Sequence, residues 1–290
     1  MDDPTGGCAL TPASGLQDPS GPSGPLIPDG LDATLVLVRH GESAFIAEGR
    51  FQGQAESPLT AVGRRQAALV GARLAAPHDP PALPVPAGPP TELVHSPLGR
   101  TTETAEAIEA ALVAAGTPTP RRADPGFLEI GQGAWQGLPR TEIAERYGAE
   151  LAAWRRTPVE AWAPGGESLP EIATRVRPAL AAVFVPLAAG RARGTHDRPQ
   201  VPGYRDAVPD HPWSIVIGHD GVFKIVLLTL FDLPLERFWM WSMDLCGISV
   251  VELRAGRPVL RAHDLTAHLV GLDDAPSRQA ADDRAADGAL

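Results

Sequence analysis

The amino-acid sequence predicts an α/β fold: a three-layer α/β/α sandwich with a mostly parallel central sheet and a small helical cap. Short apolar runs rich in β-branched residues, such as 34–38 and 214–217, are typical of strands buried on both faces of a parallel sheet. Segments with helical spacing of apolar residues alternate with these runs, which is the order expected of layered α/β folds. No repeat of solenoid length occurs, and the 290 residues suit a single large domain.

The first predicted strand, 34–38, runs directly into a turn at 39–41. A helix is expected over 60–76, because its first residue, a threonine, is a suitable N-cap and apolar residues recur after it at helical spacing. Residues 77–90 carry many prolines, which lack a backbone donor and fix φ, so this segment is predicted to be a loop. A short strand is expected at 92–95.

The rest of the chain alternates in the same way. The predicted elements are helices over 101–115, near 141–154 and after Ser168 to about 188, a strand at 214–217, a helix over 222–230, and two strands at 248–253 and 258–262 around a turn. Irregular, glycine-rich sequence begins at 127, so the segment from about 127 to 170 is expected to form the cap.

Two terminal segments and one internal segment differ in composition from the predicted domain, which spans 32–272. Residues 1–31 are rich in Pro, Gly, Ser and Asp and are predicted to be a disordered leader without the basic and apolar regions of a signal peptide. The polar segment 190–212 is predicted to be a loop insertion, and 273–290 a disordered acidic tail.

Charge and cysteine content exclude several classes of protein. A formal net charge of -10 argues against a nucleic-acid surface, which needs clustered Lys and Arg, although a local pocket can still be positive. Cys8 and Cys246 form no CxxC motif, so neither a disulfide framework nor a cysteine zinc site is expected, and a reducing cytoplasm is the expected location. The longest apolar run, 222–231, is too short to span a membrane and contains Lys224.

A small group of polar residues lies at predicted strand ends and helix starts, where α/β proteins bind their ligands. Its members are Arg39, His40, Arg100, Glu129 and His219. Two arginines and two histidines around one pocket would bind a dianion, because the planar guanidinium matches phosphate oxygens. A neutral imidazole can attack phosphorus, and a carboxyl group can protonate the leaving oxygen and later activate water.

Short motifs around these residues follow one another in a recognisable order. They span 37–43, 49–54, 96–105, 127–137, 164–168, 217–222 and 264–269. Together, over about residues 34 to 269, they resemble the histidine phosphatase superfamily, in the branch that contains cofactor-dependent phosphoglycerate mutase and its phosphatase relatives.

The resemblance implies a role for each polar residue. His40 would be the nucleophile that becomes phosphohistidine, while Arg39, Arg100 and His219 would hold the phosphoryl oxygens. Glu129 would act as general acid and then as general base, and neither a metal nor a cofactor would be needed. The further residues expected to bind substrate are Ser43, Gln52, Gly53 and Asp220.

The chain departs from the pattern of that family in a few places. Ile46 stands where many relatives have an Asn that contacts phosphate, so one donor is missing or is replaced by Ser43 or Gln52. Asp220 stands where Gly is common. His95 stands where Ser or Tyr is usual, and it is expected to be the last side chain of its strand rather than part of the pocket rim.

The expected function is that of a metal-independent phosphatase acting on a small phosphomonoester, with a homodimer possible. The alternative is a phosphoglycerate mutase, but mutases typically carry a Trp-Asn pair where this chain has Phe45 and Ile46, and the loop after Glu129 is similar to the phosphatase branch. A third alternative is a phosphoryl-binding protein without turnover, which only Ile46 favours. The sequence does not identify the phosphomonoester.

Overall fold

The computed structural model describes residues 25–190 and 210–272, which form a six-stranded sheet in the order β3-β2-β4-β1-β5-β6. The strands are β1 (Ala33–Arg39), β2 (Leu93–His95), β3 (Arg121–Ala123), β4 (Trp213–Gly218), β5 (Ile248–Arg254) and β6 (Arg257–Leu265). Strands β3, β2, β4 and β1 run parallel to one another, and β5 and β6 complete the sheet as antiparallel strands. The mostly parallel sheet predicted from the sequence is confirmed.

Some predictions concern segments outside the described residues. They are the leader up to residue 24, the insertion over 191–209 and the tail from 273, and these predictions stay predictions. The last part of the predicted leader is described, and there Leu26, Ile27 and Leu31 pack against the core, because their apolar side chains are buried by it.

Strand β1 is buried over its whole length, as its continuous apolar run predicts. Val36 and Val38 pack on one face of the sheet, whereas Leu35 and Leu37 pack on the other. The strand pairs in parallel with β4, and Arg39 lies opposite Gly218 in the register. The residues that follow these two strands therefore leave the sheet at the same edge.

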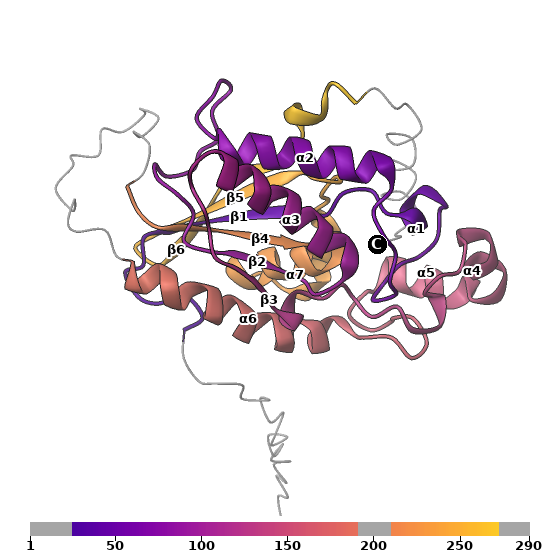
Figure 1. Ribbon diagram of the computed structural model, residues 1–290. Helices are drawn as coiled ribbons and strands as arrows, with labels where there is room; N and C mark the ends of the chain where they lie inside the picture. The colour runs from indigo at the N-terminus through magenta and orange to yellow at the C-terminus, as the bar shows by residue number, and fades with distance from the viewer. Residues whose placement is uncertain (1–24, 191–209, 273–290) are drawn as a thin grey trace, which may run out of the picture.

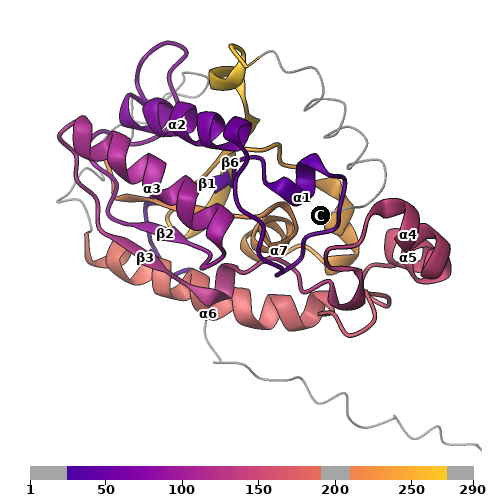
Figure 2. The same ribbon diagram turned by 45° about the vertical axis from the view of Figure 1, so that its right-hand side comes forward.

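Helices cover both faces of the sheet, so the predicted sandwich of three layers is present (Figures 1 and 2). Helices α2 (Ala61–Ala75) and α3 (Gly99–Ala114) pack together on one face, and α6 (Leu169–Ala189) and α7 (Asp220–Leu230) pack on the other. Helix α2 begins as predicted, because the Oγ1 atom of Thr60 accepts a hydrogen bond from the Gly63 amide at 3.0 Å.

Helix α6 has a well-defined start and an apolar inner face. The Ser168 side chain and the N3 residue Glu171 form a capping box, so the backbone amides of these two residues are satisfied. Within the described parts of the chain, α6 is long and apolar enough by composition to cross a membrane, and here its apolar residues, including Val176, Leu180 and Val183, lie in the core against α7 and the sheet.

The cap contains two helices where the sequence predicts one. Helices α4 (Arg140–Arg146) and α5 (Gly148–Arg156) are separated at Tyr147, whose φ of -133° is not helical. Helix α5 is anchored by Trp154, which packs against Phe238 and Trp239 at ring-centroid distances of 5.4 Å. The cap thus lies beside the short helix α1 (Ala44–Ala47), near the edge of the sheet where β1 ends (Figures 1 and 2).

Four short 3-10 helices complete the described part of the structure. They are η1 (Pro125–Phe127), η2 (Gly133–Trp135), η3 (Leu235–Met240) and η4 (Ala267–Leu269).

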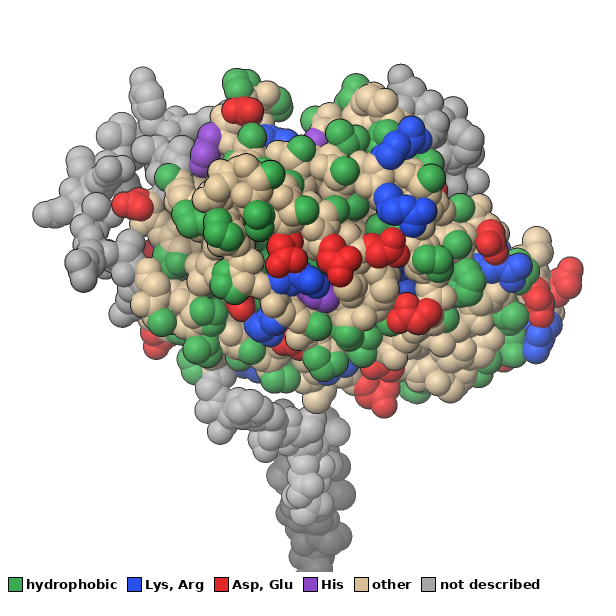
Figure 3. All heavy atoms as spheres, in the orientation of Figure 1, with side chains coloured by type: hydrophobic (Ala, Val, Ile, Leu, Met, Phe, Trp, Pro, Cys, Tyr) green, Lys and Arg blue, Asp and Glu red, His purple; other side chains and the backbone are tan. Residues whose placement is uncertain are grey.

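Acidic side chains gather over α3 on the outer surface, with basic and histidine side chains below them (Figure 3). There Arg121 pairs with Glu109 at 2.8 Å, and its Nη1 atom lies 3.2 Å from Nε2 of His95. His95 is therefore the last side chain of β2, and it contacts Arg121 of the neighbouring strand β3.

Candidate active site

His40 and His219 follow the ends of adjacent parallel strands, and their rings meet in the interior of the protein. His40 directly follows β1, and its backbone amide donates to the carbonyl of Gly218 at 3.0 Å. His219 directly follows β4 and is the N-cap of α7. The ring centroids are 5.0 Å apart in an edge-to-face arrangement, and both side chains are buried. The parallel register of β1 and β4 thus brings the two imidazoles together.

One ring nitrogen of His40 is held by the backbone. Its Nδ1 atom lies 2.7 Å from the carbonyl oxygen of Gly41. Because a carbonyl oxygen only accepts hydrogen bonds, Nδ1 carries the proton in the neutral ring and Nε2 keeps its lone pair. The same glycine allows helix α2 to approach closely, since a Cβ atom at Gly41 would lie 2.5 Å from the carbonyl oxygen of Gly63.

Arg100, in the first turn of α3, lies between the two histidines. Its Nε atom is 3.3 Å from Nε2 of His40 and 3.2 Å from Nδ1 of His219. Its Nη1 and Nη2 atoms donate to the carbonyls of Ala55 and Gly53 at 3.0 and 2.7 Å, which fixes the plane of the guanidinium. Burial lowers the pKa of Arg100 to about 10, so the group still carries its charge at neutral pH.

His219 is neutral in this environment. Burial, followed by the positive charge of Arg100 and the neighbouring His40, lowers the pKa of His219 well below its usual range. Arg100 can only donate to Nδ1, so Nε2 of His219 carries the proton and donates to the Oγ atom of Ser96 at 2.9 Å. Ser96 follows β2 in the way that the two histidines follow β1 and β4, which is the sequence signal that could have identified it.

Arg39 ends β1 and is also buried. Its Nη1 atom donates to the carbonyl of Met243 at 2.5 Å, and within the described ranges its buried Nε atom has no hydrogen-bond partner. The guanidinium is therefore anchored at one nitrogen while another buried donor is left for a ligand. Met243 is a contact that no sequence motif indicated, because it acts through its backbone.

Glu129 lies in the loop between η1 and η2, and its carboxylate is held at the N-terminus of α7. The Gly221 amide donates to Oε2 at 3.2 Å, while the amides of Val222 and Ile130 donate to Oε1 at 3.0 and 2.9 Å. A Cβ atom at Gly221 would lie 2.7 Å from Oε1, so only glycine permits this approach. Burial raises the pKa of Glu129 against these hydrogen bonds, which favours a protonated carboxyl group.

The residues expected to bind substrate fall into two groups. Ser43 and Gln52 are buried together, and the Ser43 hydroxyl donates to Oε1 of Gln52 at 2.5 Å. Gly53 has a φ of +52°, and its carbonyl accepts from Arg100. Ile46 is buried on α1 and offers no polar group at the place where an Asn was expected.

Asp220 is already bonded on both carboxylate oxygens. Lys224 donates to Oδ2 at 2.6 Å, and the Met243 amide donates to Oδ1 at 2.9 Å. Burial opposes the charge on Asp220, but Lys224 and Arg39 hold its pKa below the usual range. Each carboxylate oxygen of Asp220 thus accepts one hydrogen bond from the protein, and direct contact of Asp220 with substrate stays a prediction.

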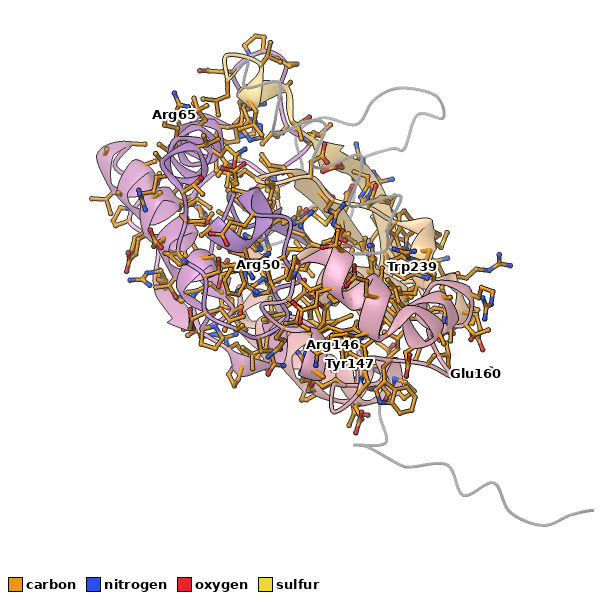
Figure 4. The ribbon with its side chains drawn as sticks, turned by 90° about the vertical axis from the view of Figure 1, so that its right-hand side faces the viewer. Arg50, Arg65, Arg146, Tyr147, Glu160 and Trp239 are labelled. Atoms are coloured by element: carbon orange, nitrogen blue, oxygen red, sulfur yellow. The ribbon has the colours of Figure 1, made fainter. Side chains whose placement is uncertain are left out.

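The cap and the loop after α1 lie on the same side of the molecule, as the labels at Arg50, Arg146 and Tyr147 in Figure 4 show, with Trp239 of η3 beside them. Arg50 donates to the carbonyl of Gly137 at 2.8 Å, which joins the α1 loop to the loop that follows Glu129. Across the described ranges, His, Cys, Asp and Glu side chains form no group of three that could hold a metal ion.

Comparisons with known proteins agree with this geometry. The model of the histidine phosphatase superfamily (branch 1) matches residues 35–266. Phosphoserine phosphatase 1 of Hydrogenobacter thermophilus is 27% identical over 238 residues, which cover 81% of this chain and 93% of that protein. A probable phosphoglycerate mutase of Proteus mirabilis is 30% identical over 222 residues, covering 75% of this chain and 84% of that protein.

Solved structures are similar as well. A mycobacterial glucosyl-3-phosphoglycerate phosphatase in complex with VO3 is 26% identical, with a TM-score of 0.62 over 80% of this chain and 99% of that one. The structure described as mycobacterial hydrolase 1 is 26% identical, with a TM-score of 0.64 over 81% of this chain and all of the other. The resemblance recognised from the sequence motifs is confirmed: the chain belongs to the histidine phosphatase superfamily, branch 1.

Proposed function

We propose that the protein is a metal-independent phosphatase that hydrolyses a small phosphomonoester through a phosphohistidine on His40. The observation that carries the proposal is the orientation of the His40 ring, whose Nδ1 is held by the Gly41 carbonyl while Nε2 faces Arg100 and His219. A nucleophile must present a lone pair, and this tautomer places it among the groups that would bind a phosphoryl dianion.

The first half of the reaction transfers the phosphoryl group to the protein. Nε2 of His40 attacks phosphorus as the bond to the ester oxygen breaks, and the leaving oxygen takes the proton of Glu129. Arg39, Arg100 and His219 stabilise the charge on the phosphoryl oxygens. A buried Glu129 with a raised pKa suits proton donation at neutral pH.

The second half returns the protein to its starting state. Glu129, now ionised, takes a proton from water while the water oxygen attacks phosphorus. The bond between phosphorus and Nε2 breaks, inorganic phosphate leaves, and Glu129 is again protonated. Ser43 and Gln52, buried beside α1, are the further groups proposed to contact the phosphoryl oxygens in place of the Asn that Ile46 replaces.

The test is hydrolysis of p-nitrophenyl phosphate in the presence of EDTA. Wild type is expected to turn over at the same rate with and without EDTA, and His40→Ala to fall to the background rate. His78→Ala is the matched control, because His78 is exposed in the proline-rich loop. Brief reaction with a labelled substrate, followed by denaturation in alkali, should trap an acid-labile phosphoryl group on wild type alone. Full activity of His40→Ala would overturn the proposal.

The second candidate is a mutase, which the similarity to the probable phosphoglycerate mutase of Proteus mirabilis favours. Supplying 3-phosphoglycerate with 2,3-bisphosphoglycerate separates the two reactions, because a mutase forms 2-phosphoglycerate faster than it releases inorganic phosphate. A protein that binds inorganic phosphate but turns over neither substrate would support the non-catalytic alternative.

A further inference from the structure

An ion pair between Arg175 and Glu167 encloses the loop that carries Glu129. Arg175 lies in the second turn of α6, and Glu167 immediately precedes the N-cap of that helix. Nε and Nη2 of Arg175 donate to the two carboxylate oxygens of Glu167 at 2.9 and 3.0 Å, which makes the pair bidentate. Neither side chain is part of the group around His40, so the pair has no role in phosphoryl binding itself.

The outer nitrogens of Arg175 are occupied by the backbone of the acid loop. Nη1 donates to the carbonyls of Gly126 and Leu128 at 3.0 and 2.9 Å, and Nη2 donates to the carbonyl of Glu129 at 2.9 Å. The guanidinium thus holds three carbonyl groups on the N-terminal side of the loop. Only the planar fork of an arginine offers donors in these directions at once; a lysine has a single ammonium group.

Glu167 holds the other side of the same loop. Its Oε2 atom accepts from the Gly131 amide at 2.7 Å, and its own amide donates back to the Gly131 carbonyl at 2.7 Å. Gln54 completes the enclosure, because its Nε2 atom donates both to Glu167 at 2.9 Å and to the Glu129 carbonyl at 3.0 Å. Side chains from outside the loop thus bind the carbonyls of Leu128 and Glu129 and the amide of Gly131, and the Glu167 amide binds the Gly131 carbonyl.

The loop that carries Glu129 and the loop before α6 are in close backbone contact. A Cβ atom at Gly166 would overlap the carbonyl oxygen of Gly131, and one at Gly133 would overlap that of Pro164. Close backbone contact of this kind transmits a displacement of one loop directly to the other. The position of the Glu129 backbone is therefore set by where α6 begins.

We propose that Arg175 and Glu167 are positioning residues that hold the Glu129 carboxyl group where it can protonate the leaving oxygen. This inference rests on the proposed function, because it assumes that Glu129 is the general acid. Glu129 is fixed at both ends: α7 amides bind its carboxylate and Arg175 binds its carbonyl. If the carbonyl end is released, the carboxyl group loses its alignment with the leaving oxygen while His40, Arg39 and Arg100 keep theirs.

The dependence of rate on the leaving group separates this role from a merely structural one. An acid catalyst matters most when the leaving oxygen is strongly basic, so its loss slows phenyl phosphate far more than p-nitrophenyl phosphate. The parameter kcat/KM reports the step that forms phosphohistidine and is measured for both esters. Arg175→Lys keeps the charge and removes the fork; Arg121→Lys is the matched control, since Arg121 has similar exposure and also pairs with a glutamate.

Wild type should show a shallow dependence on leaving-group basicity. In Glu129→Gln, kcat/KM for phenyl phosphate is expected to fall by about 10²–10⁴-fold, the usual contribution of a general acid. In Arg175→Lys the fall is expected to be roughly 10–10²-fold, as for a misplaced catalytic group. For p-nitrophenyl phosphate both losses should be at least about tenfold smaller, and Arg121→Lys should match wild type for both esters.

A second variant guards against failure to fold. Glu167→Gln keeps the size of the side chain, should show the same preferential loss on phenyl phosphate, and is compared with wild type by circular dichroism. In the Glu129→Gln background, Arg175→Lys should cause no further loss on phenyl phosphate. Equal losses on both esters in Arg175→Lys and Glu167→Gln would overturn the positioning role. Equal losses in Glu129→Gln would instead overturn the acid role of Glu129, and with it the proposed mechanism.

Discussion

The Nδ1 atom of His40 and the carbonyl oxygen of Gly41 are 2.7 Å apart, so the ring of the proposed nucleophile is oriented by the residue that follows it. This bond depends on the course of the backbone at the end of β1. That course depends in turn on the contact between Gly41 and Gly63 of α2, where a side chain would not fit. The packing of a helix on the sheet and the orientation of the imidazole are thus one structural arrangement.

Gly41→Ala should therefore damage both stability and activity. The added Cβ atom would lie 2.5 Å from the Gly63 carbonyl oxygen, so α2 or the turn must move. We expect a loss of about 1–3 kcal/mol in the free energy of unfolding and roughly 10²-fold in kcat/KM. Gly148→Ala is the control, because nothing lies within 4 Å of a Cβ atom there. Urea unfolding and hydrolysis assays give both quantities, and a fully active Gly41→Ala would contradict this account of His40.

Ser96→Ala tests the anchoring of His219. The hydroxyl is the partner of Nε2 at 2.9 Å, so its removal frees the ring to rotate and leaves a buried N–H without a partner. We expect kcat/KM to fall by about tenfold, since the bond is worth about 0.5–1.5 kcal/mol. Ser214→Ala is a suitable comparison, because the buried Ser214 hydroxyl has no hydrogen-bond partner among the described residues and its loss should leave activity intact. If both variants behave alike, Ser96 does not orient His219.

Lys224→Met should lower the free energy of unfolding, because it leaves the buried charge of Asp220 without its partner Lys224. Asp220 and Lys224 form a buried pair at 2.6 Å with i,i+4 spacing, and removal of the cation is expected to cost about 3–5 kcal/mol in the free energy of unfolding. Arg146→Met breaks the exposed i,i+4 pair with Glu142 and should leave the free energy of unfolding almost unchanged, because water screens an exposed pair. The double variant Asp220→Asn/Lys224→Met should recover part of the loss; additive losses in a double-mutant cycle would argue against the pairing.

The same pair has a definite pH dependence. The pKa of Asp220 is lower in the folded protein than its ordinary value of 3.8, so the unfolded chain binds a proton more readily. The stability that the ionised carboxylate contributes is present above pH 3.8 and is lost as the pH falls through the folded pKa. Asp220→Asn should therefore lose stability relative to wild type at neutral pH and less in acid.

Asp264→Asn should have the opposite pH profile. Burial, together with the neighbouring Asp244, raises the pKa of Asp264 from 3.8 to about 6 against the hydrogen bond from the Asp244 amide. The folded state thus binds the proton more tightly, and the stabilisation it brings is complete below pH 3.8 and is lost as the pH rises through about 6. Asn tolerates the left-handed φ of 52° at this position. In thermal unfolding, the melting temperature of the variant should therefore rise relative to that of wild type from pH 4 to pH 8.

The residues that converge on the site were the easiest to predict from the sequence. His40 and His219 come directly after apolar runs that predict buried strands, and the parallel pairing of β1 with β4 brings the two rings together. The helical motif after Ser96 likewise places Arg100 at the start of α3. The motif residues are themselves the residues that meet in the site, so the sequence motifs were sufficient to predict which side chains converge.

Other features could not be predicted because their partners are backbone atoms or distant residues. Strand β3, with the sequence Arg121-Arg122-Ala123, has no apolar run because it pairs only with β2 at the edge of the sheet. Arg175 binds backbone carbonyls of residues that lie 46 to 49 positions away. Because every residue has a backbone carbonyl, the sequence does not indicate which ones an arginine binds. The Met243 amide that donates to Asp220 lies 23 positions away, whereas the pair of Asp220 with Lys224 has an i,i+4 spacing that can be read from the sequence.

Helix α7 presents two different groups from its first turn: His219 as its N-cap and the amides of Gly221 and Val222 that bind Glu129. The imidazole proposed to bind charge and the carboxyl group proposed to donate the proton are therefore both held by the start of one helix. A shift of the α7 axis displaces both in the same direction and preserves the distance between them. Sequence changes in the surrounding loops can then alter the rim of the site while the distance between His219 and Glu129 stays the same.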